Sequence, residues 1–163
     1  MKVYLAADHA GFPLKQELVS FVRTLGHSVD DCGAHALDME DDYPGIIRLA
    51  AQKLSDDVEA NRGESRLIVI GGSGQGEAIV ANRHKWVRCA LFYGEPVRPQ
   101  VDAAGKTLDL ISSTRIHNDA NALSLGARFI TVDEAKEAVK KWLATEFTFE
   151  ERHKRRVWQI DSL

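Results

Sequence analysis

A glycine-rich turn, "GGSGQGE" from Gly71 to Glu77, contains the residues that most directly suggest chemistry. It follows a run of β-branched residues and precedes an amphipathic stretch, so we expect it to link a strand to a helix. Backbone amides at the start of a helix lack intrahelical acceptors and favour a negative charge. Glu77 adds a proton acceptor beside these amides. This combination suits removal of a proton from a carbon next to a carbonyl, with the amides stabilising the enolate.

Three familiar glycine motifs fail to describe this turn. A P-loop needs a lysine before a hydroxyl residue, and the first lysine after the turn is Lys85. The dinucleotide pattern G-x-G-x-x-G, counted from Gly72, reaches Glu77 where its third glycine should stand. The nucleophile elbow G-x-S-x-G has Gln75 in place of its last glycine. Nucleotide binding is therefore not expected.

The near match to a nucleophile elbow leaves a serine hydrolase as one alternative. Ser73, then Asp102 or Asp109, and then His117 follow the chain order of α/β-hydrolase catalytic residues. A purely structural interpretation is also open, in which Ser73 is a helix N-cap and Glu77 is a glutamate favoured by the helix dipole. The residue types of the turn do not choose among these interpretations.

Polar clusters elsewhere in the chain offer further candidates. "AADHAG" contains Asp8 and His9, and "RIHNDAN" contains His117, a residue type that titrates near neutral pH. Arg152 and Arg156, four residues apart, share a helix face and suit a phosphate group. Each cluster also has a plain interpretation: a helix cap, an incidental histidine and a solvated basic face. Neither H-x-x-x-H nor paired cysteines occur, so we expect no metal site.

Strands and helices alternate along the chain, which predicts an α/β fold with a parallel sheet and helices on both faces. In such sheets ligands bind beyond the carboxyl ends of the strands, where we expect "ADHAG", the glycine turn and "HND" to meet. Segment 94–115 contains two prolines and predicts a long loop with a helical turn. We expect strands at 2–8, 27–33, 66–72, 87–93 and 127–132, and helices at 13–26, 43–58, 73–83, 133–145 and 147–163.

Length and composition set the remaining bounds. A chain of 163 residues suits a single domain, 1–163. The net charge of -3 and the pI of about 6.1 do not suggest nucleic acid or an acidic membrane as a partner. No apolar run approaches ~20 residues, so we expect no membrane span. Cys32 and Cys89 are expected to be free thiols, which fits a cytoplasmic location.

The motifs of this chain, and their order, resemble those of the ribose-5-phosphate isomerase type B family, which includes galactose-6-phosphate isomerase subunits. The resemblance covers nearly the whole chain and rests on "VYLAADHAGFPLKQEL", "DCGA", "DDYP", "GGSGQGEAIVANR", "VRCAL", "HNDANALSLGAR" and "RHKRRV". It implies a three-layer, Rossmann-like α/β fold. It also implies metal-independent aldose–ketose isomerisation of a sugar phosphate through an enediolate, without a cofactor. The first expectation is the conversion of ribose 5-phosphate to ribulose 5-phosphate in the pentose phosphate pathway. A tetrose or hexose phosphate is an alternative substrate, and a non-catalytic phosphosugar-binding module is an alternative function.

Two forms of the catalytic base occur in this family: a cysteine that ends the third strand, or a glutamate after the glycine turn. Here Gly72 stands at the cysteine position and Glu77 at the glutamate position. The resemblance implies that Glu77 is the base and that Ser73 moves a proton between two oxygens. It further implies that His117, with Asp8, opens the sugar ring. The other implied substrate contacts are His9, Tyr43, Gly72, Gly74, Gln75, Gly76, Asn118, Arg128, Arg152 and Arg156.

The resemblance also implies a shared site. In this family the site forms between two subunits, and the arginines of the C-terminal helix can come from the partner. A homodimer is implied, with further assembly to a tetramer left open. "GEPVRPQVDAAGKTLDL" lies in a segment that is longer than in the family pattern. This addition leaves the preferred sugar open.

Overall fold

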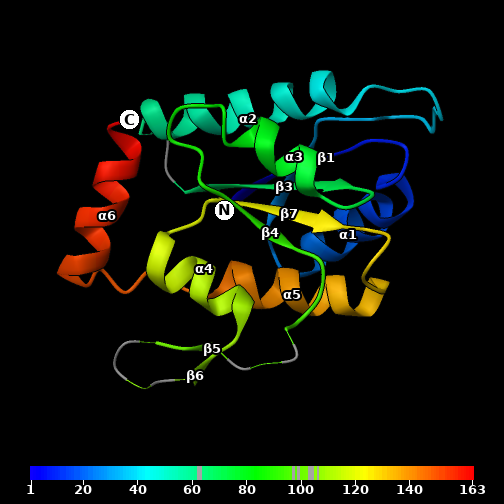
Figure 1. The fold of residues 1–163 in the computed structure, drawn as a ribbon. Helices are drawn as coiled ribbons and strands as arrows, with labels where there is room; N and C mark the ends of the chain where they lie inside the picture. Colours follow the sequence, from blue (N-terminus) through cyan, green and yellow to red (C-terminus); the bar gives the residue numbers. More distant parts are fainter. Residues whose placement is uncertain (62–63, 97, 99, 103–104, 106) are drawn as a thin grey trace.

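The computed structural model describes residues 1–61, 64–96, 98, 100–102, 105 and 107–163, in which strands and helices alternate (Figure 1). The strands are β1 (Lys2–Ala7), β2 (Ser28–Asp31), β3 (Ser65–Gly71), β4 (Cys89–Phe92), β5 (Gln100–Val101), β6 (Thr107–Leu108) and β7 (Ala122–Gly126). The helices are α1 (Phe12–Thr24), α2 (Tyr43–Glu59), α3 (Gln75–Ala81), α4 (Leu110–Asn118), α5 (Val132–Ala144) and α6 (Glu151–Asp161).

Within the described residues, five strands form a sheet in the order β2-β1-β3-β7-β4, and every pairing is parallel. Ala7 pairs with Ile70, and Gly71 pairs with Gly126. The carboxyl ends of β1, β3 and β7 therefore lie side by side. We call this boundary of the sheet, formed by strand ends and not by an outer strand, its carboxyl edge, and the boundary formed by the amino ends its other edge. The predicted parallel α/β sheet is confirmed.

Helices cover both faces of the sheet, with α2 and α3 on one side and α1, α4 and α5 on the other (Figure 1). β1 shows why both faces are apolar, because successive side chains of a strand point to opposite faces. Val3 and Leu5 pack in the core under α1 and α5, whereas Tyr4 and Ala6 pack in the core under α2. A strand buried on both faces reads as a continuous apolar run, as the sequence shows.

The last strand of the sheet lies earlier in the chain than expected. A strand at 127–132 was predicted, and this prediction was wrong: β7 ends at Gly126 and a turn follows. The amides of Ala127 and Arg128 donate to the carbonyls of Gly71 and Gly72, which bends the chain across the end of β3. Thr131 then caps α5. The turn places Arg128 beside the glycine turn.

Segment 94–115 also differs from its prediction as a long loop with a helical turn. Its described part contains the antiparallel pair β5 and β6 and most of α4. Residues 97, 99, 103, 104 and 106 of the predicted loop lie outside the described residues. Asp109 begins α4 as an N-cap whose side chain accepts from the Ser112 amide. Since short polar side chains at caps are local signals, this helix start was accessible from the sequence.

The C-terminal helix α6 is shorter than the predicted 147–163 and packs against α4. Its last turn is tied to the sheet, because Arg88 donates to both carboxylate oxygens of Asp161 at 2.9 and 2.8 Å. Contact with a partner subunit remains an expectation. None of the helices in the described part of the chain is both long and apolar enough to cross a membrane.

Two leucines on α2 test whether the packing of α2 against the sheet stabilises the fold. Leu54 is fully buried, whereas Leu49 on the same helix is 53% exposed. We expect Leu54→Ala to lower the free energy of unfolding by about 2–5 kcal/mol, because it leaves a cavity under the sheet. Leu49→Ala should change it by no more than about 0.5 kcal/mol. Urea denaturation measures both, and equal losses would contradict the packing described here.

Candidate active site at the end of β3

Glu77 lies in the first turn of α3, and its side chain is buried, with a residue exposure of 4%. The turn that leads to it depends on Gly74, the N-cap of α3, whose φ of 75° is in the left-handed region that favours glycine. The Ser124 hydroxyl on β7 donates to the Gly74 carbonyl at 2.6 Å. The hydrogen bond from β7 therefore fixes the turn against the sheet, and the turn directs Glu77 back toward the end of β3.

The Glu77 carboxyl group packs directly against the backbone of Gly71. A Cβ atom added at Gly71 would lie 2.1 Å from both Cδ and Oε1 of Glu77, so no larger residue fits there without displacing the carboxyl group. Burial raises the pKa of Glu77, and the negative charge of Asp8 raises it further, while a hydrogen bond from its own amide lowers it. Among the described residues Glu77 makes no ion pair. A carboxylate in this state is a stronger proton acceptor than one in water.

Two further side chains contact the glycine turn from other elements. A Cβ atom at Gly72 would lie 3.2 Å from the guanidinium carbon of Arg128, which follows β7. A Cβ atom at Gly76 would lie 2.6 Å from the ring of Tyr43, at the start of α2. The turn therefore brings together an acid, a cation and a phenol from three separate parts of the chain. Ser73, the remaining candidate, accepts from the Gln75 amide at 3.3 Å.

Asp8 and His9 follow β1 at the same edge. Asp8 is buried, and its carboxylate accepts from the Gly11 amide at 3.0 Å. Gly11 is the N-cap of α1, so the interpretation of Asp8 as the cap of that helix was wrong. His9 contacts a residue that the sequence analysis did not select: its Nδ1 lies 2.6 Å from Oδ1 of Asp41. The two residues are 32 positions apart, so only the "DDYP" segment quoted above drew attention to this region.

Asp8, His9 and Asp41 also bear on the prediction that the chain holds no metal. One ligand atom from each lies within 4.8 Å of the others, a grouping that spacing along the sequence does not reveal. Carboxylate and imidazole ligands suit several divalent cations. Here, however, Oδ1 of Asp41 is already engaged by the Nδ1 and the amide of His9. We interpret the group as a hydrogen-bonded pair beside Asp8, and metal independence stays a prediction.

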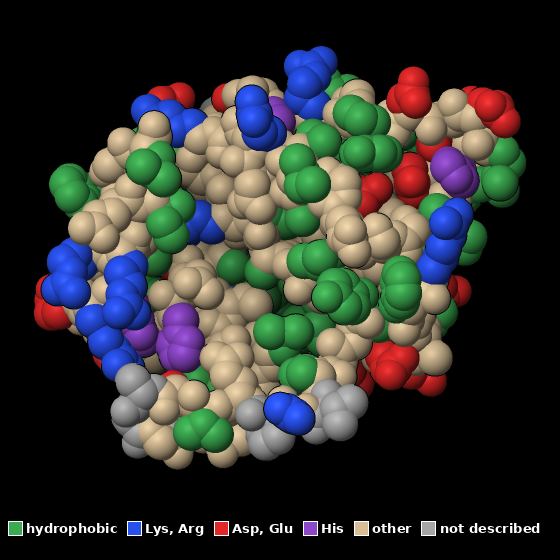
Figure 2. All heavy atoms as spheres, in the orientation of Figure 1, with side chains coloured by type: hydrophobic (Ala, Val, Ile, Leu, Met, Phe, Trp, Pro, Cys, Tyr) green, Lys and Arg blue, Asp and Glu red, His purple; other side chains and the backbone are tan. Residues whose placement is uncertain are grey.

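His117 and Asn118 lie at the other edge of the sheet. The prediction that "HND" falls at the carboxyl ends of the strands was wrong, because α4 runs back across the sheet and ends at Asn118, just before β7 begins. The His117 ring packs on that of His153 in α6, with centroids 4.7 Å apart. Figure 2 shows Lys and Arg side chains gathered over α6, beside histidine side chains. Arg152 and Arg156 belong to this helix.

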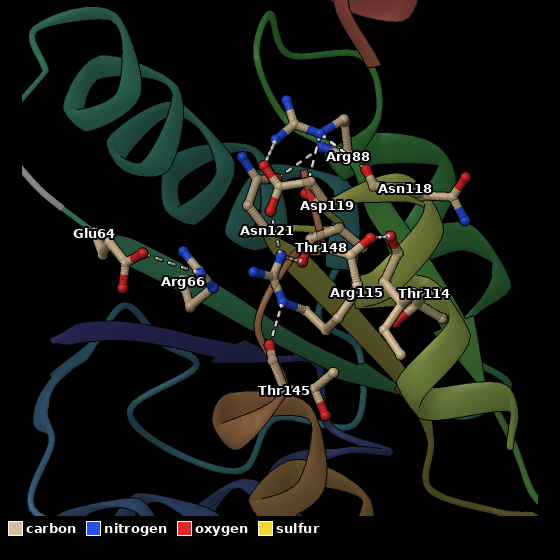
Figure 3. A network of polar contacts seen from close by, with 12 residues as sticks. Glu64, Arg66, Arg88, Thr114, Arg115, Asn118, Asp119, Asn121, Thr145 and Thr148 are labelled. Carbon is tan, nitrogen blue, oxygen red and sulfur yellow. Dashed lines mark hydrogen bonds and ion pairs between the residues drawn. The ribbon is translucent and has the colours of Figure 1, made fainter. Parts of the chain in front are cut away.

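A polar network holds the turn that carries His117 and Asn118 (Figure 3). Asp119 accepts from Arg88 at 2.9 Å and from Arg115 at 2.7 Å, and its φ of 43° marks a left-handed turn. Arg115 is buried and also donates to the Thr145 carbonyl at 3.1 Å. The sequence analysis missed both arginines, and only their place in "VRCAL" and beside "HND" could have drawn attention to them.

A groove of about 930 Å³ lies at this second edge. It runs between the connection from α3 to β4 and the last residues of α6, and Asn118 lies on its wall. Glu77 does not line it. Within one chain, the predicted site residues therefore form two groups. One group surrounds the glycine turn: Asp8, His9, Tyr43, Gly72, Ser73, Gly74, Gln75, Gly76, Glu77 and Arg128. The other surrounds the end of α4: His117, Asn118, Arg152 and Arg156.

The same separation weighs against the serine hydrolase alternative. Ser73 and His117 lie at opposite edges of the sheet, so the hydroxyl and the imidazole do not meet within one chain. Asp109 accepts from both the amide and the hydroxyl of Ser112, as a helix cap does. The described chain thus lacks the contact between nucleophile and base that defines a catalytic triad.

Comparison with known proteins finds relatives that match nearly the whole chain. The ribose/galactose isomerase family model matches residues 3–160. Ribose-5-phosphate isomerase B of Mycolicibacterium paratuberculosis is 37% identical over 157 residues, covering 96% of this chain and 87% of that protein. A Bacillus subtilis protein described in general terms as a sugar phosphate isomerase is 35% identical, covering 98% and 95%. The structure of ribose-5-phosphate isomerase B from Mycoplasma genitalium with bound ribulose-5-phosphate matches with a TM-score of 0.82 at 30% identity, covering 99% of this chain and 94% of that one.

The parallel sheet, the glycine turn and these matches together define an aldose–ketose isomerase of sugar phosphates. The chain belongs to the ribose/galactose isomerase family. Its place in carbohydrate metabolism follows from that membership.

Gly71 provides a direct test of the contact with Glu77. We expect Gly71→Ala to reduce isomerase turnover by roughly 100-fold or more, because the new methyl group would displace a carboxyl group that must be positioned to within about 1 Å. Gly45→Ala is the matched control, since a Cβ atom there meets nothing within 4 Å. Turnover and thermal unfolding should be measured for both variants. A folded Gly71→Ala protein with unchanged turnover would contradict this placement of Glu77.

Proposed function

We propose that this protein converts ribose 5-phosphate to ribulose 5-phosphate through an enediolate, with Glu77 as the base. The observation that carries the proposal is the buried Glu77 carboxyl group against Gly71, beside the glycine turn. The named activity of the Mycolicibacterium paratuberculosis relative and the ribulose-5-phosphate bound in the Mycoplasma genitalium structure support this choice of sugar.

The proposed reaction moves one proton between neighbouring carbons. Glu77 takes the proton from C2 of the open-chain aldose, and the electron pair of that bond shifts toward the C1 carbonyl, which becomes the enediolate oxygen. The amides between Gly72 and Gly76 stabilise this charge as it develops. Ser73 moves a proton between the oxygens on C1 and C2, and Glu77 returns its own proton to C1, which yields the ketose. His117 and Asp8 open the sugar ring before this step.

The substrate phosphate would lie on the other side of the glycine turn from the base. Arg128 contacts Gly72 there, and His9 precedes α1 at the same edge. Guanidinium and imidazolium groups both donate charge-assisted hydrogen bonds to phosphate oxygens. Arg152 and Arg156 would complete the phosphate site, and Tyr43 and Asn118 would line the sugar pocket.

A homodimer would join the two groups of residues that one chain keeps apart. In a two-fold dimer, the same pair of surfaces meets twice. The glycine turn of one subunit would then face His117, Asn118, Arg152 and Arg156 of its partner, and α6 would extend to that partner. Further assembly to a tetramer stays open. We also propose that residues 1–163 act as one isomerase domain in the cytoplasm, where the thiols of Cys32 and Cys89, free in the described chain, would persist.

A tetrose or hexose phosphate is the second candidate substrate. The Bacillus subtilis relative is described only as a sugar phosphate isomerase. Segment 94–115, which the resemblance indicates is longer than in the family pattern, holds β5 and β6 between β4 and α4. A change of substrate would leave Glu77 and the glycine turn in the same roles, since the proton transfer involves only C1 and C2.

Glu77→Gln separates catalysis from binding. We expect turnover of ribose 5-phosphate to fall by at least about 1,000-fold, because the amide cannot accept the C2 proton. Binding of the sugar phosphate should persist, since the side chain keeps its size. NMR of solvent exchange at C2, over a panel of tetrose, pentose and hexose phosphates, measures the reaction. Wild-type protein that binds these sugars but exchanges no proton would instead be a phosphosugar-binding module.

Mixing two inactive variants tests the shared site. A Glu77→Gln subunit paired with a His117→Asn subunit should form one site with both native residues and one site with neither. Statistical pairing of co-expressed subunits should then restore about a quarter of wild-type turnover, since two-fold symmetry gives each heterodimer one intact site. Native mass spectrometry verifies the heterodimer. Heterodimers without recovered turnover would show that both residues act within one subunit.

A further inference from the structure

Asp41 contacts His9 at two points. Its Oδ1 lies 2.6 Å from Nδ1 of the His9 ring and accepts from the His9 backbone amide at 3.1 Å. His9 belongs to the connection between β1 and α1, and Asp41 lies just before α2. The contact therefore joins two loops at the carboxyl edge of the sheet. With both the amide and one ring nitrogen held, the ring has little freedom to rotate.

The Asp41 side chain is only 10% exposed, so water screens its charge weakly. Its second oxygen, Oδ2, is buried and has no hydrogen-bond partner among the described residues. A buried carboxylate that lacks other partners stabilises a neighbouring cation strongly. The nearest such group is the His9 imidazole. Because Nδ1 is engaged by Asp41, Nε2 is the ring atom that remains to donate to a ligand.

Three charged groups face the His9 ring: Asp41, Asp8 and Arg128. The hydrogen bond that the His9 ring donates to the Asp41 carboxylate is the main cause that raises the pKa of His9, and the charge of Asp8 adds to it. Burial and the charge of Arg128 act in the opposite direction. Without Asp41, the guanidinium that would bind the same phosphate would also favour loss of the His9 proton.

We propose that Asp41 is a positioning residue, which orients His9 toward the phosphate group of the substrate and keeps its imidazole positively charged. This inference rests on the proposed function of the site. A dianionic phosphate between Arg128 and a charged His9 would receive two charge-assisted hydrogen bonds, whereas a neutral ring could offer only an ordinary one. The role of Asp41 should therefore appear in substrate binding and in its pH dependence, while the proton transfer at Glu77 proceeds unchanged.

Asp41→Asn tests this assignment, with Asp42→Asn as the matched control. Both variants remove one negative charge from adjacent positions, but Asp42 is exposed and its side chain makes no cap hydrogen bond to α2. We expect Asp41→Asn to raise KM for ribose 5-phosphate by roughly tenfold, the effect of losing one hydrogen bond to a charged group. Its kcat should stay within about twofold of wild type. Asp42→Asn should leave both constants unchanged, and an equal rise in KM in the control would overturn the proposal.

The pH dependence of KM gives a readout that a merely structural role would not change. A raised pKa keeps His9 charged to higher pH, so the wild-type KM should rise only above that pKa. In Asp41→Asn the rise should begin at lower pH. Ionisation of the substrate phosphate near pH ~6 is common to both proteins and cancels in the comparison. Parallel profiles for wild type and Asp41→Asn would contradict the assignment.

NMR titration of the histidine rings separates this inference from the proposed function. His9→Gln assigns the His9 signal, and inorganic phosphate serves as a probe that needs no turnover. We expect a wild-type His9 pKa above the ordinary value of about 6.5, lowered in Asp41→Asn, with weaker phosphate binding in that variant. Protein that isomerises no sugar phosphate but shows these shifts would refute the proposed function alone. A wild-type pKa at or below the ordinary value would overturn the role of Asp41, whether or not Asp41→Asn folds.

Discussion

A carboxyl group in contact with a residue that has no side chain is the feature on which the candidate active site depends. Glu77 occupies the volume that any Cβ atom at Gly71 would need. Gly71 in turn ends β3 and pairs with Gly126 at the end of β7, so the position of the acid is fixed by the central strands of the sheet. Burial disfavours the charged carboxylate, which is a cost to folding but makes the group a better proton acceptor. The proposed base is thus held by the central strands of the sheet.

Charged side chains of both signs surround the glycine turn. Asp8 lies near Glu77 and raises its pKa, while Arg128 and His9 supply positive charge at the same edge of the sheet. A sugar phosphate has the complementary pattern, with a carbonyl group at one end and a phosphate at the other. The proposed orientation places the carbons that exchange a proton next to the acid and the phosphate next to the cations. Electrostatics, together with the shape of the turn, would then select both the substrate class and its direction.

Topology explains why one chain holds only part of the proposed site. In a parallel sheet, a helix must return the chain to the opposite edge before the next strand begins. α4 does so, and it carries His117 and Asn118 away from the glycine turn. The arginine network around Asp119 then holds these residues firmly where they are. A rigid edge of this kind is suited to meet a second subunit, since little conformational freedom would be lost on assembly.

The sequence by itself determined the α/β class, most of the helices and the placement of Glu77 after a glycine turn, while its role as base rests on the family resemblance. These features depend on local signals: apolar runs, glycine at a left-handed turn, and a carboxylate in the first turn of a helix. β7 was misplaced because apolar residues continue on both sides of Gly126 in "ALSLGARFITV", and only pairing with β3 decides where the strand ends. The edge of the sheet that carries His117, and the contact of Asp41 with His9, were decided by tertiary structure alone. Such contacts join residues far apart in the chain, and no local pattern encodes the path that brings them together.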